Sequence, residues 1–140
     1  MSAPSRVMVD WKGKRNFECG REGRPSILID GDGHDGPSPP DTLLAALGSC
    51  VSVDVVDILA KRRTPAETFN VEVLGERVDS IPRKFKHITL NFTITGADID
   101  RASAMRAIEL SANNYCSVRD SLDPNIPVVL NLKLNGSEEA

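Results

Sequence analysis

The feature that most constrains the fold is an apolar stretch, residues 43–59, that follows a strong helix start signal. Ser38 is a favourable N-cap, Pro39 suits the first helical position, and Asp41 stands three residues after the cap, as in a capping box with Asp in place of Glu. The pattern predicts a helix over about 39–62. Because its middle is apolar on nearly every side, this helix should run through the centre of the molecule or of a dimer.

Alternation of polar and apolar residues predicts the strands. It is most regular in residues 70–78 and 85–94, which indicates strands with one buried and one solvated face. Four further segments are rich in strand-forming residues and are bounded by turn signals. They are residues 6–11, 16–19, 27–29 and 127–134.

A second helix is predicted between the last two strands, and either Asp98 or Asp100 can cap it. Its apolar residues recur at helical spacing towards Cys116, and residues 117–122 indicate a further short helix. The resulting order, β-β-β-α-β-β-α-α-β, does not alternate regularly. The predicted fold class is therefore α+β with a mostly antiparallel sheet. The chain length fits a single domain over residues 1–140.

The composition argues against several classes of protein. The formal net charge of -3 lacks the basic excess of nucleic-acid-binding proteins. No apolar run reaches the roughly 20 residues that cross a bilayer, and the first six residues hold no hydrophobic signal segment. We therefore expect a cytoplasmic protein with no nucleic-acid partner and no membrane partner.

The chain has three cysteines, an odd number and too few for a disulfide scaffold. Cys50 lies halfway along the predicted central helix, where it is either a small core side chain or a reactive thiol. Cys116 precedes a short helix whose N-terminus would stabilise a thiolate. Cys19, near the end of a short strand, is interpreted as incidental. Redox chemistry needs Cys50 and Cys116 within reach of each other, which the sequence leaves open.

Other polar residues carry weaker signals. Asp54 follows Cys50 by one helical turn on the same face. An acid in a buried helix must be paired, so Asp54 either orients an arginine or satisfies a structural donor. His34 and His87 form no C-x-x-C or H-x-x-x-H spacing with each other or with the cysteines, so no metal site is predicted.

Two segments carry a resemblance to the OsmC/Ohr family. Residues 36–50, GPSPPDTLLAALGSC, resemble the helix start that leads to the reactive cysteine of that family, and residues 110–118, LSANNYCSV, resemble its second cysteine motif. The resemblance implies an OsmC-like fold, in which mostly antiparallel sheets wrap two long central helices in an intertwined homodimer with active sites at the interface. It also implies that Cys50 is the reactive cysteine and Cys116 the resolving one.

Other residues resemble one branch of the family or depart from the family pattern. Residues 53–59 and 82–88 resemble a branch whose substrate is not well defined. The peroxidase branches carry Glu ten residues before the reactive cysteine, where this chain has Pro40, and Asp41 is the nearest acid. Those branches also activate the cysteine with an arginine from the N-terminal strands. Arg15, Arg21 and Arg24 lie there, and we take Arg21 as the candidate.

The function implied by the resemblance is thiol-dependent reduction of organic hydroperoxides in oxidative-stress defence, which would make the protein a thiol peroxidase. Cys50 would attack the peroxide, Cys116 would resolve, and an external dithiol would restore the pair without metal or organic cofactor. Leu47, Val51 and Asp54, with residues of the partner, would form the substrate site. The alternative is a non-catalytic protein of the same fold that binds a small molecule or senses redox state, which the displaced acid and the unassigned arginine favour.

Overall fold

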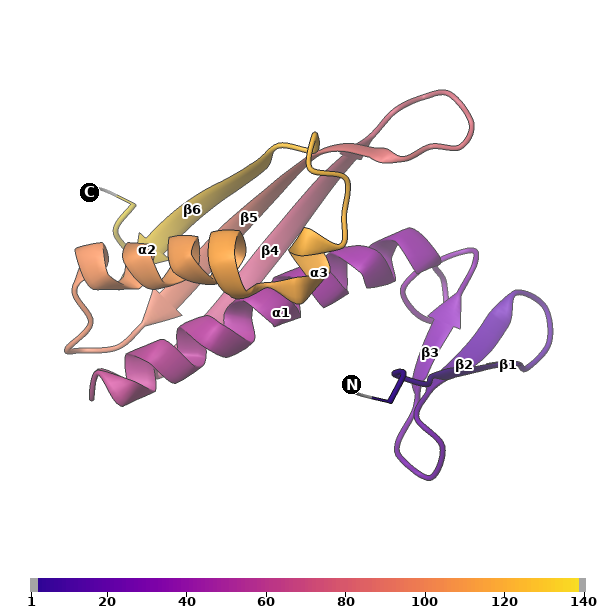
Figure 1. Cartoon of the computed structure of the whole chain (residues 1–140), viewed down its shortest axis with the longest axis horizontal. Helices are drawn as coiled ribbons and strands as arrows, with labels where there is room; N and C mark the ends of the chain where they lie inside the picture. The colour runs from indigo at the N-terminus through magenta and orange to yellow at the C-terminus, as the bar shows by residue number, and fades with distance from the viewer. Residues whose placement is uncertain (1–2, 139–140) are drawn as a thin grey trace. The chain divides into compact units, whose positions relative to one another are not determined.

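The computed structural model describes residues 3–138 and divides into two compact units, residues 1–43 and 44–140. The N-terminal unit holds an antiparallel sheet of β1 (Met8–Trp11), β2 (Asn16–Gly20) and β3 (Ile27–Asp30), in that order (Figure 1). These strands confirm the three short strands predicted from the sequence. The single domain expected from the chain length stays a prediction.

A tight loop connects β3 to the first helix and is organised by one carboxylate. Asp30 is buried, and its side chain accepts hydrogen bonds from the backbone N–H groups of Asp32 (2.9 Å), His34 (3.1 Å) and Asp35 (2.9 Å). These bonds, led by the one from Asp35, lower the pKa of Asp30. These hydrogen bonds stabilise the backbone of residues 32–35.

The central helix, α1 (Pro39–Lys61), begins with the predicted capping box. The N–H of Ser38 donates to the Asp41 carboxylate (3.1 Å), and the N–H of Asp41 donates to the Ser38 hydroxyl (3.2 Å). Two of the N–H groups that a helix start leaves unpaired are thus satisfied. The sequence pattern predicted both the start of α1 and, within one residue, its end.

The C-terminal unit contains a second sheet, of order β4-β5-β6. Strands β4 (Thr68–Arg77) and β5 (Phe85–Thr95) are antiparallel, whereas β6 (Val128–Leu134) runs parallel to β5. The parallel pair arises because the chain crosses over through α2 (Arg101–Leu110) before it returns. The predicted α+β class with mostly antiparallel pairing is confirmed.

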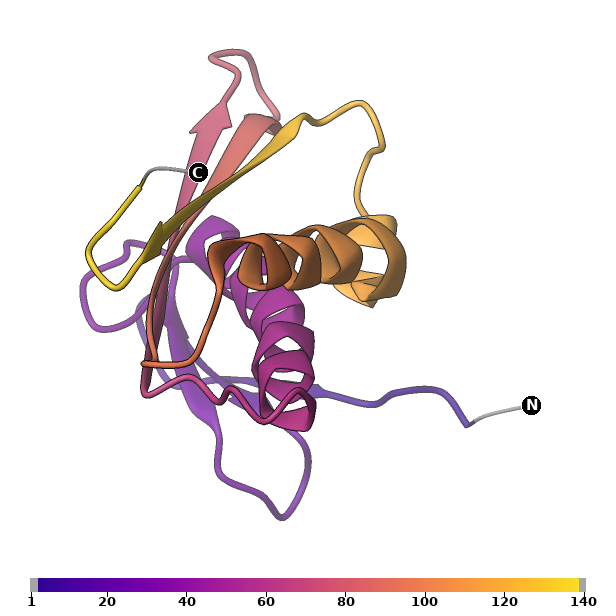
Figure 2. The same ribbon diagram turned by 90° about the vertical axis from the view of Figure 1, so that its left-hand side faces the viewer.

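Helices α1 and α2 lie on the same face of this second sheet (Figures 1 and 2). The core forms where alternate residues of β5 meet the buried stripe of α1. The rings of Phe92 and Phe69 pack edge to face, with their centroids 5.9 Å apart. Gly48 brings α1 close to β4, because a Cβ at this position would lie 2.7 Å from Cγ2 of Val73. The buried stripe of α1 consists of Leu47, Gly48, Val51, Val55 and Leu59.

The other side of α1 is open in the single chain, although the sequence predicted a helix buried all round. Val53 is 60% exposed and Val56 42% exposed. By length and composition alone α1 could cross a membrane, but its packed stripe makes it a core helix of this unit. One side of the helix is therefore buried and the other exposed, although its sequence is apolar on nearly every side.

After β5 the chain forms three consecutive helical segments. Asp100 caps α2 by accepting a hydrogen bond from the Ser103 N–H (2.9 Å), which confirms one of the two predicted caps. Next come a π-helical turn, η1 (Ser111–Tyr115), and the short α3 (Ser117–Asp120). The sequence pattern predicted α3 but not the π-helical geometry, which places Cys116 at the junction between η1 and α3.

Candidate active site

The structure brings Cys50 and Cys116 together from two elements distant in the chain. Cys50 is half-buried on α1, and Cys116 is buried between η1 and α3; both thiols are free. The Cys50 sulfur interacts with the Cys116 thiol, the Ser117 hydroxyl and the backbone N–H groups of Ser117 and Val118. Figure 1 shows α3 beside the middle part of α1. The two sulfurs lie close enough to influence each other's pKa, and their roles as a redox pair stay predictions.

The π-helical turn positions Cys116. Its backbone N–H donates to the carbonyl of Ser111 (2.9 Å), five residues earlier, which is the hydrogen bond that defines a π turn. The fully buried Ser111 hydroxyl donates to the carbonyl of Val51 (2.8 Å) and lies 3.4 Å from Asp54 Oδ2. The start of η1 is thus tied to the backbone of α1 directly beside Cys50.

The surroundings of Cys50 favour its thiolate. Burial raises the pKa of Cys50, but the N–H of Val118, the thiol of Cys116 and the Ser117 hydroxyl and N–H all act in the opposite direction. Their combined effect outweighs burial and lowers the pKa of Cys50 below its ordinary value. The Cys50 thiol therefore ionises more readily than an ordinary cysteine thiol.

The surroundings of Cys116 have the opposite effect. Burial raises its pKa, and although the Arg119 N–H donates to its sulfur (3.3 Å), both the hydrogen bond to Cys50 and the charge of Cys50 raise the pKa further. The Cys116 thiol therefore ionises less readily than the Cys50 thiol.

The residues predicted to form the substrate site have mainly structural contacts in the single chain. Leu47 and Val51 are fully buried in the core behind Cys50. Asp54 accepts from Ser111, which corresponds to the structural-donor alternative, and Asp41 forms the capping box. Their roles toward a substrate stay predictions.

The arginines predicted as activators all belong to the N-terminal unit. Arg15 forms an ion pair with Asp32 (2.8 Å) and donates to the Gly31 carbonyl (3.3 Å). Arg21 follows β2 directly and is exposed, and its carbonyl accepts from the N–H of Arg24 (3.2 Å). The action of Arg21 on Cys50 stays a prediction.

Sequence reasoning missed three groups of this site: Ser111, Ser117 and Arg119. Arg119 is held on η1, where its guanidinium donates to the Asn113 side chain (2.6 Å) and to the carbonyl of Ala112 (3.3 Å). The proximity of Ser117 and Arg119 to Cys116 in the sequence was an available signal. Ser111 offered only the weaker signal of a hydroxyl within a buried helical segment.

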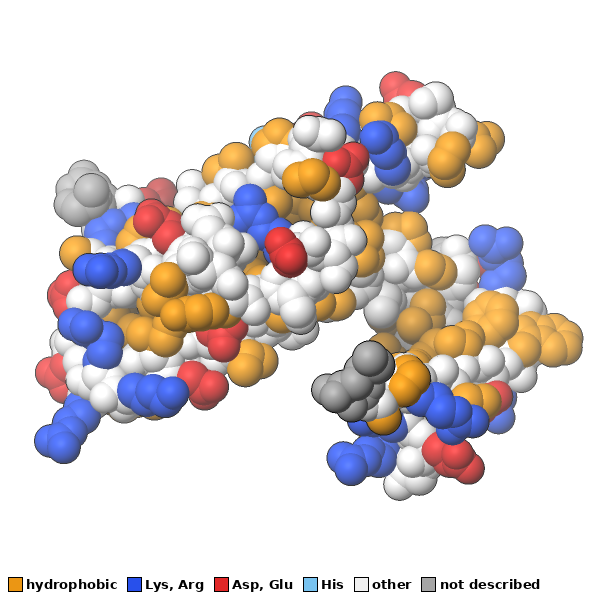
Figure 3. All heavy atoms as spheres, in the orientation of Figure 1, with side chains coloured by type: hydrophobic (Ala, Val, Ile, Leu, Met, Phe, Trp, Pro, Cys, Tyr) orange, Lys and Arg blue, Asp and Glu red, His pale blue; other side chains and the backbone are white. Residues whose placement is uncertain are grey.

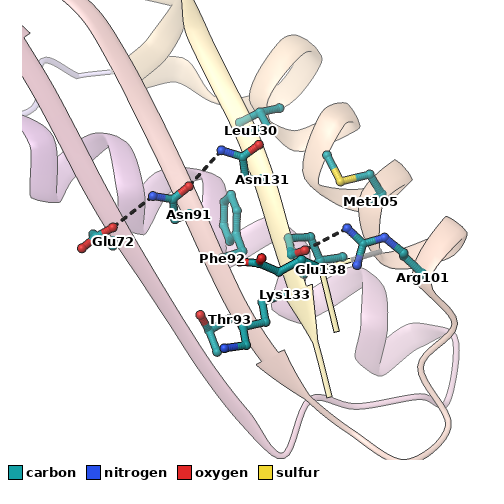
Figure 4. Close-up of a pocket in the computed structure, with 11 residues that line it drawn as sticks. Glu72, Asn91, Phe92, Thr93, Arg101, Met105, Leu130, Asn131, Lys133 and Glu138 are labelled. Carbon is teal, nitrogen blue, oxygen red and sulfur yellow. Dashed lines mark hydrogen bonds between the residues drawn. The ribbon is translucent and has the colours of Figure 1, made fainter. Parts of the chain in front are cut away.

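Two cavities of the C-terminal unit bear on ligand binding. One, of about 390 Å³, opens beside Cys116 and is lined by η1, α3 and the turn after it, with Asn113, Asn114, Arg119 and Leu122 in its walls. The other, of about 540 Å³, lies beside β6, and no cysteine is among the described residues that line it (Figure 4). Its polar groups are bonded to one another: Asn131 donates to Asn91 (2.9 Å), which donates to Glu72 (3.0 Å).

The side chains that most often bind metals do not cluster in the described part of the chain. Residues 3–138 contain no group of three or more His, Cys, Asp or Glu side chains placed to hold a metal ion.

The fold is α+β, and its central helix places one free cysteine beside a second one that follows a π turn. These features define a class of proteins with a pair of neighbouring thiols. The OsmC-like protein family matches residues 31–131, and the chain belongs to this family. It is 42% identical over 103 residues to Protein YhfA of Escherichia coli K12, covering 73% of this chain and 77% of YhfA. The resemblance noted in the sequence is confirmed.

Solved structures agree with this assignment. A hypothetical protein from Aquifex aeolicus VF5 superposes with a TM-score of 0.84 at 22% identity, covering 96% of this chain and 98% of that one. The organic hydroperoxide resistance protein OhrB of Bacillus subtilis superposes with a TM-score of 0.60 at 19% identity, covering 94% and 98%. The chain thus has the OsmC-like fold, and the structures of organic hydroperoxide resistance proteins share this fold.

Proposed function

We propose that this protein reduces organic hydroperoxides with Cys50 as the nucleophile and Cys116 as the resolving thiol. The observation that carries the proposal is the opposed shift of two adjacent free thiols, with the pKa of Cys50 lowered and that of Cys116 raised. A peroxidatic thiol must ionise, whereas a resolving thiol must stay close by and attack later. Proteins of the same fold that are named organic hydroperoxide resistance proteins support the choice of substrate class.

The chemistry balances with one external reductant. The Cys50 thiolate attacks the peroxide oxygen, the O–O bond breaks, and the alkoxide takes a proton to leave as an alcohol. Cys50 becomes a sulfenic acid, which Cys116 attacks to form a disulfide and release water. An external dithiol then reduces the disulfide by two electrons and becomes a disulfide itself. No metal or organic cofactor takes part.

We also propose that the protein works as a cytoplasmic homodimer whose interface covers the open side of α1. Exposed Val53 and Val56 lie on that side. A groove of about 510 Å³ between α1 and α2 includes Ile58 and Leu110, with Arg62 and Arg106 also in its walls. Figure 3 shows apolar side chains with charged ones around them over these helices. In such a dimer the partner would supply the remaining walls of the substrate site, including Arg21.

Consumption of cumene hydroperoxide with dithiothreitol as reductant tests the proposed activity. The wild-type protein should consume the peroxide, and Cys50→Ser should not. Cys19→Ser is the matched control. Cys19 lies on β2, outside the Cys50–Cys116 pair, so this substitution should leave the rate unchanged. Equal rates for the wild type and Cys50→Ser would refute the proposal. A Cys50–Cys116 disulfide that forms with peroxide but gives no turnover would instead favour the redox-sensing alternative.

A further inference from the structure

The cavity beside Cys116 approaches only one of the two sulfurs. Its walls come from η1, α3 and the turn that follows, and no residue of α1 lines it in the described chain. Cys116 itself lines the cavity, whereas Cys50 does not. The cavity therefore reaches Cys116 without reaching Cys50.

This placement matters for the step that regenerates the enzyme. Thiol–disulfide exchange proceeds when a thiolate attacks one sulfur and displaces the other, so the attacker must approach from the side opposite the departing sulfur. A thiol in the cavity borders Cys116, and its attack there would displace the Cys50 sulfur. The same thiol has no comparable route to the Cys50 sulfur through this cavity.

The acidity of the departing thiol also favours attack on Cys116. Exchange is faster when the displaced thiol has the lower pKa. The N–H group of Val118 and the Ser117 hydroxyl and N–H stabilise Cys50 as a thiolate, while burial raises the pKa of Cys116. Displacement of Cys50 from the disulfide is therefore favoured over displacement of Cys116.

We propose that the cavity formed by η1 and α3 is the docking site for the external thiol reductant, which forms its mixed disulfide with Cys116. This inference rests on the proposed Cys50–Cys116 disulfide. The reductant thiolate attacks Cys116, the S–S bond breaks, and Cys50 leaves as a thiolate. The second thiolate of a dithiol then attacks the reductant's own bound sulfur. Cys116 departs and takes a proton, and the dithiol closes into a disulfide.

A trapping experiment on the full chain tests which sulfur is attacked. The Cys50–Cys116 disulfide is formed with diamide, so the experiment does not depend on peroxide activity. Brief reaction with 2-mercaptoethanol is stopped with acid, free thiols are blocked with N-ethylmaleimide, and peptides are identified by mass spectrometry. We expect mercaptoethanol on Cys116 and maleimide on Cys50. The reverse labelling, equal labelling, or failure of diamide to join the two cysteines would overturn the proposal.

A second measurement tests the cavity itself. Asn114 is exposed in the cavity wall, and Asn114→Trp should slow reduction of the diamide-formed disulfide by dithiothreitol by about tenfold, since access of the thiol governs exchange. Asn70→Trp is the matched control, because Asn70 is exposed on β4 outside the cavity. Unchanged reduction in Asn114→Trp would overturn docking at this cavity.

The two proposals fail in different ways. Labelling of Cys116 without peroxide consumption would leave the docking site intact and refute the peroxidase. Peroxide consumption that depends on Cys50, together with labelling of Cys50 by mercaptoethanol, would refute the docking site and leave the peroxidase intact.

Discussion

Substitution of Ser111 by alanine should weaken both the fold and the coupling of the two thiols. The Ser111 hydroxyl is fully buried and joins η1 to α1 through the Val51 carbonyl (2.8 Å) and Asp54 (3.4 Å). A hydrogen bond contributes about 0.5–1.5 kcal/mol net, and one to a charged group about 1.5–3 kcal/mol. The contact with Asp54 is long and shares one proton with Val51, so its contribution should lie at the low end.

We therefore expect Ser111→Ala to lower the free energy of unfolding by about 2 kcal/mol. The loss should be visible in urea denaturation of the reduced protein. Because η1 would no longer be fixed to α1, Cys116 and the N–H of Val118 should move away from Cys50, and the pKa of Cys50 should rise towards its ordinary value. Thiolate absorbance during a pH titration measures this second effect.

Ser52→Ala is the matched control for this substitution. Ser52 also lies on α1, but its hydroxyl donates only to the Gly48 carbonyl of the same helix (2.6 Å), so its loss should change stability by less than about 0.5 kcal/mol. If Ser111→Ala resembled Ser52→Ala in both unfolding free energy and Cys50 titration, the assignment of Ser111 as the connection between the two cysteine elements would be wrong.

Three further predictions follow from the same contacts. Gly48→Ala should destabilise the protein by about 1–3 kcal/mol in urea denaturation, because its Cβ would overlap Val73; stability equal to wild type would contradict the close packing of α1 on β4. Iodoacetamide should alkylate Cys50 at a lower pH than it alkylates an ordinary cysteine. Cys116→Ser should shift the pH dependence of this alkylation upward, because the hydrogen bond donated to Cys50 is weakened. Identical pH dependence in the wild type and Cys116→Ser would argue against an effect of Cys116 on Cys50. Val56→Asp should convert the proposed dimer to monomer in sedimentation analysis, since a charge would be buried at the interface; an unchanged mass would remove α1 from the interface.

Local signals in the sequence were sufficient for the helix starts and most strands. Ser38 and Asp41, like Asp100, satisfy helix N–H groups within a few residues, so their roles can be identified without knowing the rest of the fold. Strand alternation in β4 and β5 likewise reflects one buried face. These features depend on contacts between near neighbours.

The features that the sequence could not supply depend on contacts between distant segments. The parallel pairing of β6 with β5 and the one-sided burial of α1 both follow from where the elements pack. The same holds for the site. The cysteine motifs identified Cys50 and Cys116, but the hydrogen-bond donors around Cys50 and the tie through Ser111 required the tertiary structure.

The π turn lies between α2 and α3. The direction in which Cys116 points therefore depends on the number of residues in this turn as well as on their chemistry. With one residue fewer between Ser111 and Cys116, the turn would close as a regular α-helix, and each residue of such a helix advances by about 100° around its axis. The second sulfur would then point to a different side of the helix. The exposed residues of η1 should accordingly tolerate exchange of one side chain for another, whereas a single-codon deletion there should separate the sulfurs even if the protein still folds.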